Sequence, residues 1–230
     1  MAVYACSDLH GTMFLYKQIK NFLEPNDIVY FLGDAGDRGS QPWQTIKAIY
    51  NDPQFIYLKG NHEDMLVNAM KSYFEEDMQF FHENYDLLCW NGGKITFENW
   101  QFENEFKTWV SKLNNLPLMH TYINSNNQKI ILNHAGFTPG TDPPFHDLIW
   151  DRKHIYHKWP NDDLYKDTII IHGHTPIFHL AKDLGFEEEV EPGALYYCDD
   201  HKICIDNGSF FTKNICLLNL DTFEEHIFSF

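Results

Sequence analysis

Basic residues are scarce in this sequence of 230 residues, which has 17 Lys and Arg against 33 Asp and Glu and a net charge of −16. Most of such a surface repels the phosphates of duplex nucleic acid and the headgroups of an anionic membrane. Long apolar runs are also missing, because no stretch approaches the roughly 20 apolar residues of a membrane helix. We therefore expect no nucleic acid duplex and no membrane among its partners.

Cysteine is infrequent as well. The five cysteines are odd in number, show no Cys-x-x-Cys spacing and lie mostly in apolar stretches: Cys6, Cys89, Cys198, Cys204 and Cys216. Such a set predicts reduced core residues and not a disulfide framework. The first residues pass straight into an acidic motif, without the basic and long apolar parts of a signal peptide. These features predict a cytoplasmic protein.

The composition itself is that of a folded protein. Hydrophobic residues make up 43% and aromatic residues 16% of the chain, well above the range of disordered sequences. A chain of this length can bury one sizeable core without disulfides or metals. Because no linker, internal repeat or low-complexity tract interrupts it, we predict a single domain over residues 1–230.

Three short apolar strands in the first part of the chain each deliver polar side chains at their carboxyl ends. The strands are predicted at 2–6, 28–32 and 55–58, and apolar residues at helical spacing predict a helix after each of the first two. The polar stretches that follow the strands are Ser7–Gly11, Gly33–Gly39 and Gly60–Glu63. Open α/β sheets bind ligands at the carboxyl ends of their strands, so the pattern predicts an α/β fold with a site there.

Residues 64 to about 116 differ in being helical, aromatic and acidic, and we predict that they form an inserted helical cap. Its helices are expected at 65–74, 78–90 and 103–113. The cap tryptophans Trp90, Trp100 and Trp109 are expected to pack inside it and not to stack on a substrate.

The second half returns to strands. A hairpin is predicted from 118–123 and 129–132, followed by a loop rich in proline and glycine at 137–150 and a buried strand at 168–171. Four further strands are expected in one antiparallel sheet, at 195–198, 202–205, 214–220 and 224–230.

Side chains at the strand ends form a mixed set of oxygen and nitrogen donors without a thiolate. They are Asp8, His10, Asp34, Asn61, His134 and His174. Such donors suit two divalent ions such as manganese, iron, zinc or magnesium better than a structural zinc ion, which favours cysteine. An aspartate such as Asp34 can bridge two ions.

The order of the motifs resembles that of the calcineurin-like metallophosphoesterases, and most of all their phosphoprotein phosphatase branch of bacterial and bacteriophage Ser/Thr phosphatases. Five blocks carry the resemblance: Asp8-Leu9-His10-Gly11, Gly33-Asp34-Ala35-Gly36-Asp37-Arg38-Gly39, Gly60-Asn61-His62-Glu63, His134-Ala135-Gly136 and Gly173-His174-Thr175. Two further segments are similar to segments of the bacterial subgroup: Trp90-Asn91-Gly92-Gly93, followed by Thr96, and Trp150-Asp151-Arg152. The resemblance implies a four-layer α-β-β-α sandwich with a helical cap.

The resemblance further implies a set of metal ligands. Asp8 and His10 would hold the first ion and Asp34 would bridge to the second. The second ion would be held by Asn61, His134 and His174. His172 leaves a choice open, because a His-x-His pair would point to a neighbouring family. The metal is expected to be manganese, with iron, zinc or magnesium as alternatives.

Roles in catalysis are implied as well. His62 would protonate the leaving oxygen and would be oriented by Asp37. Arg38 would clamp the phosphate, and Arg152 is a weaker candidate for a second clamp. These roles agree with the chemistry, since guanidinium groups match phosphoryl oxygens and a leaving alkoxide needs a proton donor.

By resemblance, the expected function is hydrolysis of phosphoserine and phosphothreonine in proteins by direct attack of a metal-bound hydroxide. The substrate would be a phosphoprotein or a small phosphoester. One alternative is a symmetric bis(5'-nucleosyl)-tetraphosphate hydrolase, although few basic residues lie between Glu63 and Glu105 to bind so many phosphates. A second alternative is an inactive binding scaffold, although such proteins usually lose ligands and here every expected ligand is present.

Overall fold

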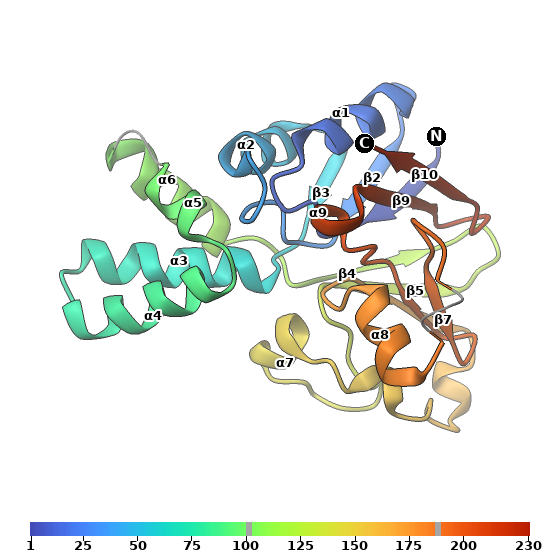
Figure 1. Cartoon of the computed structure of the whole chain (residues 1–230). Coiled ribbons are helices and arrows are strands. Elements are labelled where there is room, and N and C mark those ends of the chain that lie inside the picture. Colours follow the sequence, from blue (N-terminus) through green and yellow to red (C-terminus); the bar gives the residue numbers. More distant parts are fainter. Residues whose placement is uncertain (100–102, 187–189) are drawn as a thin grey trace.

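The structure, a computed structural model, describes residues 1–99, 103–186 and 190–230. Within these residues two five-stranded sheets form the centre (Figure 1). The first sheet consists of β10 (Glu225–Ser229), β9 (Asn214–Asn219), β1 (Val3–Cys6), β2 (Ile28–Phe31) and β3 (Phe55–Tyr57), in that order. The second consists of β4 (Met119–Ile123), β5 (Lys129–Asn133), β6 (Thr168–His172), β8 (Lys202–Cys204) and β7 (Tyr196–Cys198).

Parallel pairing brings the motif-bearing loops to one side of each sheet. Strands β1, β2 and β3 are parallel neighbours, and so are β5, β6 and β8. The remaining strands pair antiparallel at the edges, β9 and β10 on the first sheet and β4 and β7 on the second. The loops after β1, β2 and β3 therefore start from one edge of the first sheet, and those after β5 and β6 from one edge of the second.

The helices of the described chain fall into three sets. Those beside the first sheet are α1 (Met13–Phe22), α2 (Pro42–Asn51) and the short α9 (Ser209–Thr212). Those beside the second sheet are α7 (Phe145–Trp150) and α8 (Ile177–Leu184), with 3-10 turns at His154–Tyr156 and Asp163–Tyr165. Between the sheets in sequence come α3 (Asn61–Phe74), α4 (Met78–Trp90), α5 (Lys94–Glu98) and α6 (Glu103–Asn114).

Apolar side chains join these elements into layers. The sheets pack face to face through a core that includes Ala5 and Tyr30 of the first sheet and Ile130 and Ile171 of the second. Residues of α1 and α2 pack with the other face of the first sheet, and smaller clusters lie between the second sheet and its helices. The predicted four-layer α-β-β-α sandwich is confirmed.

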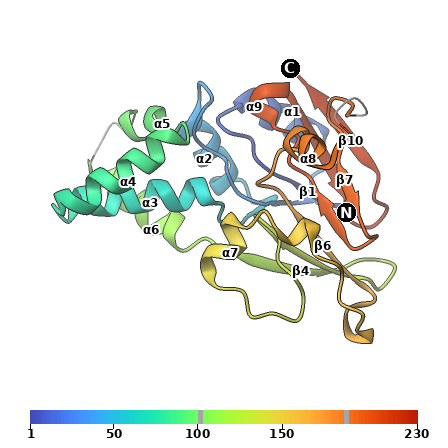
Figure 2. The ribbon, with the colours of Figure 1, turned by 60° about the horizontal axis from the view of Figure 1, so that its bottom comes forward.

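Helices α3 to α6 project from one side of the sandwich as an arm (Figures 1 and 2). Trp109 of α6 is buried and packs at 6.1 Å between ring centroids from Trp43 of α2, as predicted. Trp90 is 84% exposed, so the prediction that it packs is wrong. It is the last residue of α4, whose inner side is occupied by other aromatic rings. Trp100 lies outside the described residues. We propose that this arm, residues 64 to about 116, is a cap inserted into a single domain.

Most predicted elements occur within one or two residues of their expected ends, but α3 begins at Asn61, four residues early. The four last strands do not form one antiparallel sheet. Strands β7 and β8 belong to the second sheet and β9 and β10 to the first, with β8 parallel to β6. Short apolar runs predict strands but carry no information on their partners. Helices α5, α7, α8 and α9 were not predicted, and α7 and α8 each follow a proline, Pro144 and Pro176.

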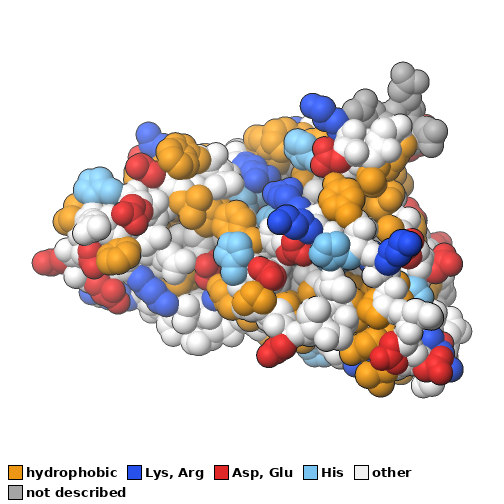
Figure 3. Space-filling model, turned by 90° about the horizontal axis from the view of Figure 1, so that it is seen from below, with side chains coloured by type: hydrophobic (Ala, Val, Ile, Leu, Met, Phe, Trp, Pro, Cys, Tyr) orange, Lys and Arg blue, Asp and Glu red, His pale blue; other side chains and the backbone are white. Residues whose placement is uncertain are grey.

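Viewed from below, the face between arm and sandwich carries a group of Lys and Arg side chains, while the arm shows apolar and acidic side chains with some Lys, Arg and His among them (Figure 3). In the described parts of the chain no helix has the length and apolarity needed to cross a membrane.

Candidate functional site

The loops that leave β1, β2 and β6 are held in a backbone conformation that side chains normally avoid. Six of their non-glycine residues have φ between +44° and +68°: Asp8, His10, Asp34, Asp37, Arg38 and His174. The left-handed region is uncommon for such residues, and clusters of it occur at functional sites. At Gly60 a side chain is excluded for another reason, because its Cβ would collide with Asp34 Oδ1. The backbone is thus bent to bring these side chains together.

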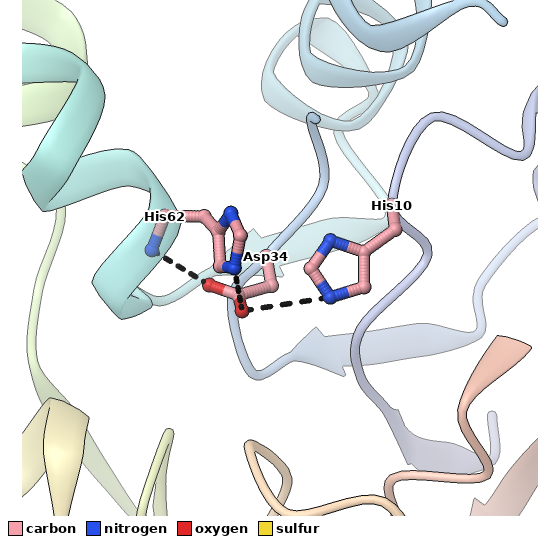
Figure 4. Close-up of side chains that lie close together, drawn as sticks. All are labelled: His10, Asp34 and His62. Carbon is pink, nitrogen blue, oxygen red and sulfur yellow. Dashed lines mark hydrogen bonds and ion pairs between the residues drawn. The ribbon is translucent and has the colours of Figure 1, made fainter. Parts of the chain in front are cut away.

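Asp34 lies at the centre of the resulting cluster. Its Oδ2 is 3.7 Å from His10 Nε2 and 3.7 Å from His62 Nε2 (Figure 4). Its Oδ1 accepts a hydrogen bond from the His62 backbone amide at 3.0 Å, in the first turn of α3. The three residues come from three successive strand ends of the first sheet, as the sequence predicts.

The second sheet brings two histidines to the other side of Asp34. His134 Nε2 is 3.4 Å from Asp34 Oδ1 and 2.9 Å from Asn61 Oδ1, and His174 Nδ1 is 3.1 Å from the same Asn61 oxygen. Donor atoms of His10, Asp34 and His62 lie within 4.8 Å of one another, and so do those of Asp34, His134 and His174. Asp34 belongs to both groups, which is the place that a bridging ligand requires.

Relative to these two groups of donors, Asp8 and His62 lie elsewhere than their predicted roles suggest. Asp8 belongs to neither group of three, but its Oδ1 lies 3.8 Å from His10 Nε2, and its Oδ2 accepts hydrogen bonds from the His174 amide and the Ser7 hydroxyl. His62, expected as a proton donor, has its Nε2 inside the first group.

The two histidines at the end of β6 differ in position. His174 lies in the second group, whereas the His172 ring lies against His154, with 4.3 Å between centroids. A His-x-His pair facing one site is therefore not formed.

The buried charges of the cluster favour a cation. Burial raises the pKa of Asp8 to about 6, and the nearby charge of Asp34 adds to the rise. Burial would lower the pKa of His134, but Asp34 and Asp8 raise it to about 10. His174 Nε2 is buried without a hydrogen-bond partner. The raised pKa values of Asp8 and His134 reflect clustered negative charge or burial, and together with the imidazole nitrogen of His174 these donors fit divalent metal ions held by oxygen and nitrogen.

A second unit beside Asp34 joins His62, Asp37 and Arg38. His62 Nδ1 lies 2.6 Å from Asp37 Oδ2. The Asp37 amide donates to the Thr96 hydroxyl at 3.0 Å, and that hydroxyl donates back to Asp37 Oδ1. Thr96 comes from α5, so the arm supports this pair. Thr96 belongs to a segment similar to one in the bacterial subgroup, but its contact with Asp37, 59 positions away in the sequence, was not predicted.

Arg38 is held by the loop between α4 and α5. Its amide donates to the Gly92 carbonyl at 3.0 Å and its Nε to the Asn91 carbonyl at 3.3 Å. Its Nη1 and Nη2 reach His10 Nε2 at 2.8 Å and His62 Nε2 at 3.0 Å. The guanidinium therefore lies directly over the first group of donors.

Glu63 fixes the loops without reaching the cluster. Its carboxylate accepts hydrogen bonds from the amides of Asp34, Ala35 and Gly60 at 2.8 to 2.9 Å and from the Tyr57 hydroxyl at 2.6 Å. Burial raises the pKa of Glu63, and the charge of Asp34 contributes to the rise. Such outer contacts set the orientation of ligands.

The donors open into a cavity of about 270 Å³. Its walls include His10, Asp34, Asn61, His62 and His174, both arginines Arg38 and Arg152, and the rings of Trp90 and Phe211. Arg152 is exposed and its Nη1 lies 3.4 Å from the Thr175 hydroxyl. Predicted residues from both sheets thus meet at one hollow with two guanidinium groups at its wall, and Asp8, Asp37 and His134 lie outside its lining.

Comparison with known families agrees with this geometry. The calcineurin-like phosphoesterase family matches residues 1–209. The chain belongs to this family. Its members are metal-dependent phosphoester hydrolases with a dinuclear divalent metal centre, so the resemblance in the motifs is confirmed at the level of the family.

Solved structures share the fold of this phosphoesterase at low identity. A serine/threonine phosphatase of Saccharomyces cerevisiae has a TM-score of 0.60 and 15% identity, with 100% of this chain and 79% of that chain covered. A cold-active protein-tyrosine phosphatase of a psychrophilic Shewanella has a TM-score of 0.56 and 16% identity, with 98% and 76% covered. A candidate diadenosine tetraphosphatase has a TM-score of 0.58 and 13% identity, with 99% and 92% covered.

Proposed function

We propose that this phosphoesterase is a phosphomonoesterase that removes phosphate from phosphoserine and phosphothreonine in proteins. The observation that carries the proposal is the single cavity in which Asp34, shared by two groups of buried donors, faces Arg38 and Arg152. One small cavity with two guanidinium groups suits one phosphoryl group. The shared fold of the yeast serine/threonine phosphatase is consistent with this proposal.

We assign the metal ligands as Asp8, His10 and Asp34 for one ion and Asp34, Asn61, His134 and His174 for the other. When bound, two divalent ions, which we propose to be manganese, would neutralise phosphoryl charge and lower the pKa of a water so that it can attack. Binding of the phosphoryl group and delivery of a proton would be carried out by side chains of the protein.

Arg38 and Arg152 would bind and orient the phosphoryl oxygens. Arg38 currently donates to His10 and His62, and a phosphoryl group offers it stronger, charge-assisted acceptors. Its hydrogen bonds to the loop between α4 and α5 already hold Arg38 in place, which would limit the loss of conformational freedom on binding.

His62 would deliver the proton to the leaving oxygen. Because its Nδ1 lies against Asp37, that nitrogen is assigned the proton, and Nε2 accepts from Arg38 in the structure. Once a phosphoryl group engages Arg38, Nε2 becomes free to carry a proton into the cavity. Asp37 then stabilises the imidazolium and holds its orientation.

A symmetric dinucleoside tetraphosphatase is the competing proposal, favoured by the exposed Trp90 ring at the cavity wall, on which a base could stack. Against it stands the lining of the cavity, in which Arg38 and Arg152 are the only Lys or Arg among the described residues. Two cations are few for a chain of four phosphates.

The test compares a phosphothreonine peptide with diadenosine tetraphosphate, using protein stripped with a chelator and then supplied with manganese. We expect kcat/KM to favour the peptide at least tenfold and activity to return only with metal. Preference for the dinucleotide would move the assignment to nucleotide hydrolysis. Metal binding without activity on either substrate would favour the scaffold. The cytoplasmic location stays part of the proposal.

A further inference from the structure

Helix α4 exposes apolar side chains on the side that faces away from the arm's core. Phe80, Leu87 and Trp90 are 57%, 40% and 84% exposed. They stand at positions i, i+7 and i+10, so they share one side of the helix. A surface helix normally places polar residues there. The outer side of α4 therefore carries an apolar stripe, defined by these three residues.

The stripe is not needed for packing of the arm. Phe81 and Tyr85 of the same helix point to the opposite side, where their rings pack 5.8 Å and 5.1 Å from Phe97 of α5. Leu88 is fully buried there as well. Helix α4 thus has a complete inner face, and the exposed stripe is additional to it.

The stripe starts at the candidate site. Trp90 lines the cavity that holds His10, Asp34 and His62. From Trp90 the stripe follows α4 outward for about 15 Å, the length of ten helical residues. A chain whose phosphorylated residue occupied the cavity would reach Trp90 first and then Leu87 and Phe80.

Acidic residues lie along the outer part of the stripe, whereas Arg38 and Lys94 lie near its Trp90 end. Between Lys71 and Lys94 the sequence has five Asp and Glu and no Lys or Arg. The acidic residues are Glu75, Glu76, Asp77, Glu83 and Asp86, all exposed or nearly so. Glu83 lies at position i+3 from Phe80, within the stripe itself. Figure 3 shows acidic and apolar side chains next to each other on the arm.

We propose that the α4 stripe is a docking surface for the phosphoprotein substrate, whose bound segment combines apolar side chains with Lys and Arg and lies next to the phosphorylated residue. This inference rests on the proposed function. Continuity with the cavity through Trp90 and the complementary charge argue for the occupant. A second copy of the chain is a poor alternative, because two acidic faces repel each other.

The experiment compares three substrates. Two are phosphothreonine peptides of about twelve residues, long enough to cover the stripe in extended form, with a flank of Leu, Phe, Lys and Arg or a flank of Gly and Ser. Each is made with the flank before or after the phosphothreonine. The third substrate is 4-nitrophenyl phosphate, which is too small to reach α4.

For the unchanged protein we expect a KM at least tenfold lower for the basic, apolar flank in one of the two directions, with a similar kcat. The double variant Phe80→Ser, Leu87→Ser should remove this preference, since burial of even one apolar side chain is worth about tenfold. Added salt should weaken the preference in the unchanged protein because the ionic part is screened. Activity on 4-nitrophenyl phosphate should stay the same.

Leu164→Ser is the matched control, because Leu164 is 74% exposed but lies outside the arm, and it should change nothing. Equal KM for both flanks in both directions, or an unaltered preference in the double variant, would overturn the docking surface while leaving the proposed function in place. Hydrolysis of 4-nitrophenyl phosphate without hydrolysis of any peptide would instead refute the proposed function.

Discussion

Buried carboxylates at the two ends of the first sheet differ in their hydrogen-bond partners. At the amino end, before β3, Asp52 accepts hydrogen bonds from the Tyr16 hydroxyl, Lys20 Nζ and the Gln54 amide at 2.9 to 3.0 Å. At the carboxyl end, Asp34 accepts one hydrogen bond, from the His62 backbone amide, and otherwise faces imidazoles at 3.4 to 3.7 Å. The first carboxylate is bonded by several donors of the chain, whereas the second has one backbone amide donor and belongs to two groups of potential metal ligands. One end of the sheet therefore contributes stability, and the other contributes chemistry.

The largest effect on activity is expected from substituting Asp34, the residue at the carboxyl end of the sheet that both donor groups share. Asp34→Asn removes the charge that both donor groups have in common and should lower kcat/KM on the phosphothreonine peptide by about a thousandfold. This size corresponds to several kcal/mol of lost charge stabilisation. Elemental analysis of the purified variant should show less bound metal than in the unchanged protein. A variant that keeps its full metal content and its activity would remove Asp34 from the centre of the site.

A more selective change at the same end is His62→Asn. We expect metal content to be kept and turnover to fall by about 10²- to 10⁴-fold on substrates with poor leaving groups, the usual contribution of a general acid. The loss should be much smaller for 4-nitrophenyl phosphate, whose leaving group needs no proton. Steady-state kinetics on both substrates measure the difference, and an equal loss on the two would argue against proton donation by His62.

The smallest effect on activity is expected at the amino end. Asp52→Asn should leave kcat/KM unchanged but lower the free energy of unfolding at pH 7 by about 1–2 kcal/mol, through weaker bonds from partners including Lys20. Urea denaturation followed by circular dichroism measures this. Altered activity with unaltered stability would contradict the contrast between the two ends.

The pH dependence of the same variant sharpens the prediction. Burial alone would raise the pKa of Asp52, but the bonds from Lys20, Gln54 and Tyr16 bring it below its ordinary value. The carboxylate therefore stabilises the fold above about pH 4 and loses that contribution as the pH falls through the lowered pKa. The stability difference between the unchanged protein and Asp52→Asn should shrink over that acidic range.

The sequence was informative where chemistry follows directly on a strand. Asp8, His10, Asp34 and Asn61 could be assigned to one site because the parallel β-α-β pattern brings strand ends together. His134 and His174 converge on them from the other sheet, which their motifs predicted through family resemblance. Helix periodicity placed α1, α2 and α4 well, since each has an inner face with regularly spaced apolar residues.

Other features depend on contacts between distant residues and were not predictable in this way. The support of Asp37 by Thr96 depends on how the arm folds back. The exposure of Trp90 depends on which side of α4 meets α5. The backbone at Asp34 and His174 is left-handed. Glycine is the residue that usually indicates this conformation, and neither position is a glycine, so the sequence did not indicate it. The chain passes from the second sheet to the first between β8 and β9. Short apolar runs do not encode this passage, so the partners of these strands could not be predicted.

The loop between α4 and α5 is bonded to Arg38, and Thr96 of α5 is bonded to Asp37. The two ends of α4 are therefore under opposite constraints. At Asn91 to Gly93 the chain is tied to the candidate site, and Gly93 has no room for a side chain beside Leu88 and Asp37. At Glu75 to Asp77 the turn is exposed and remote from the donors. Insertions and extensions in relatives of this chain should therefore accumulate at the outer turn, while the inner loop keeps its length. The arm can therefore differ in length without changing the positions of Arg38 and Asp37.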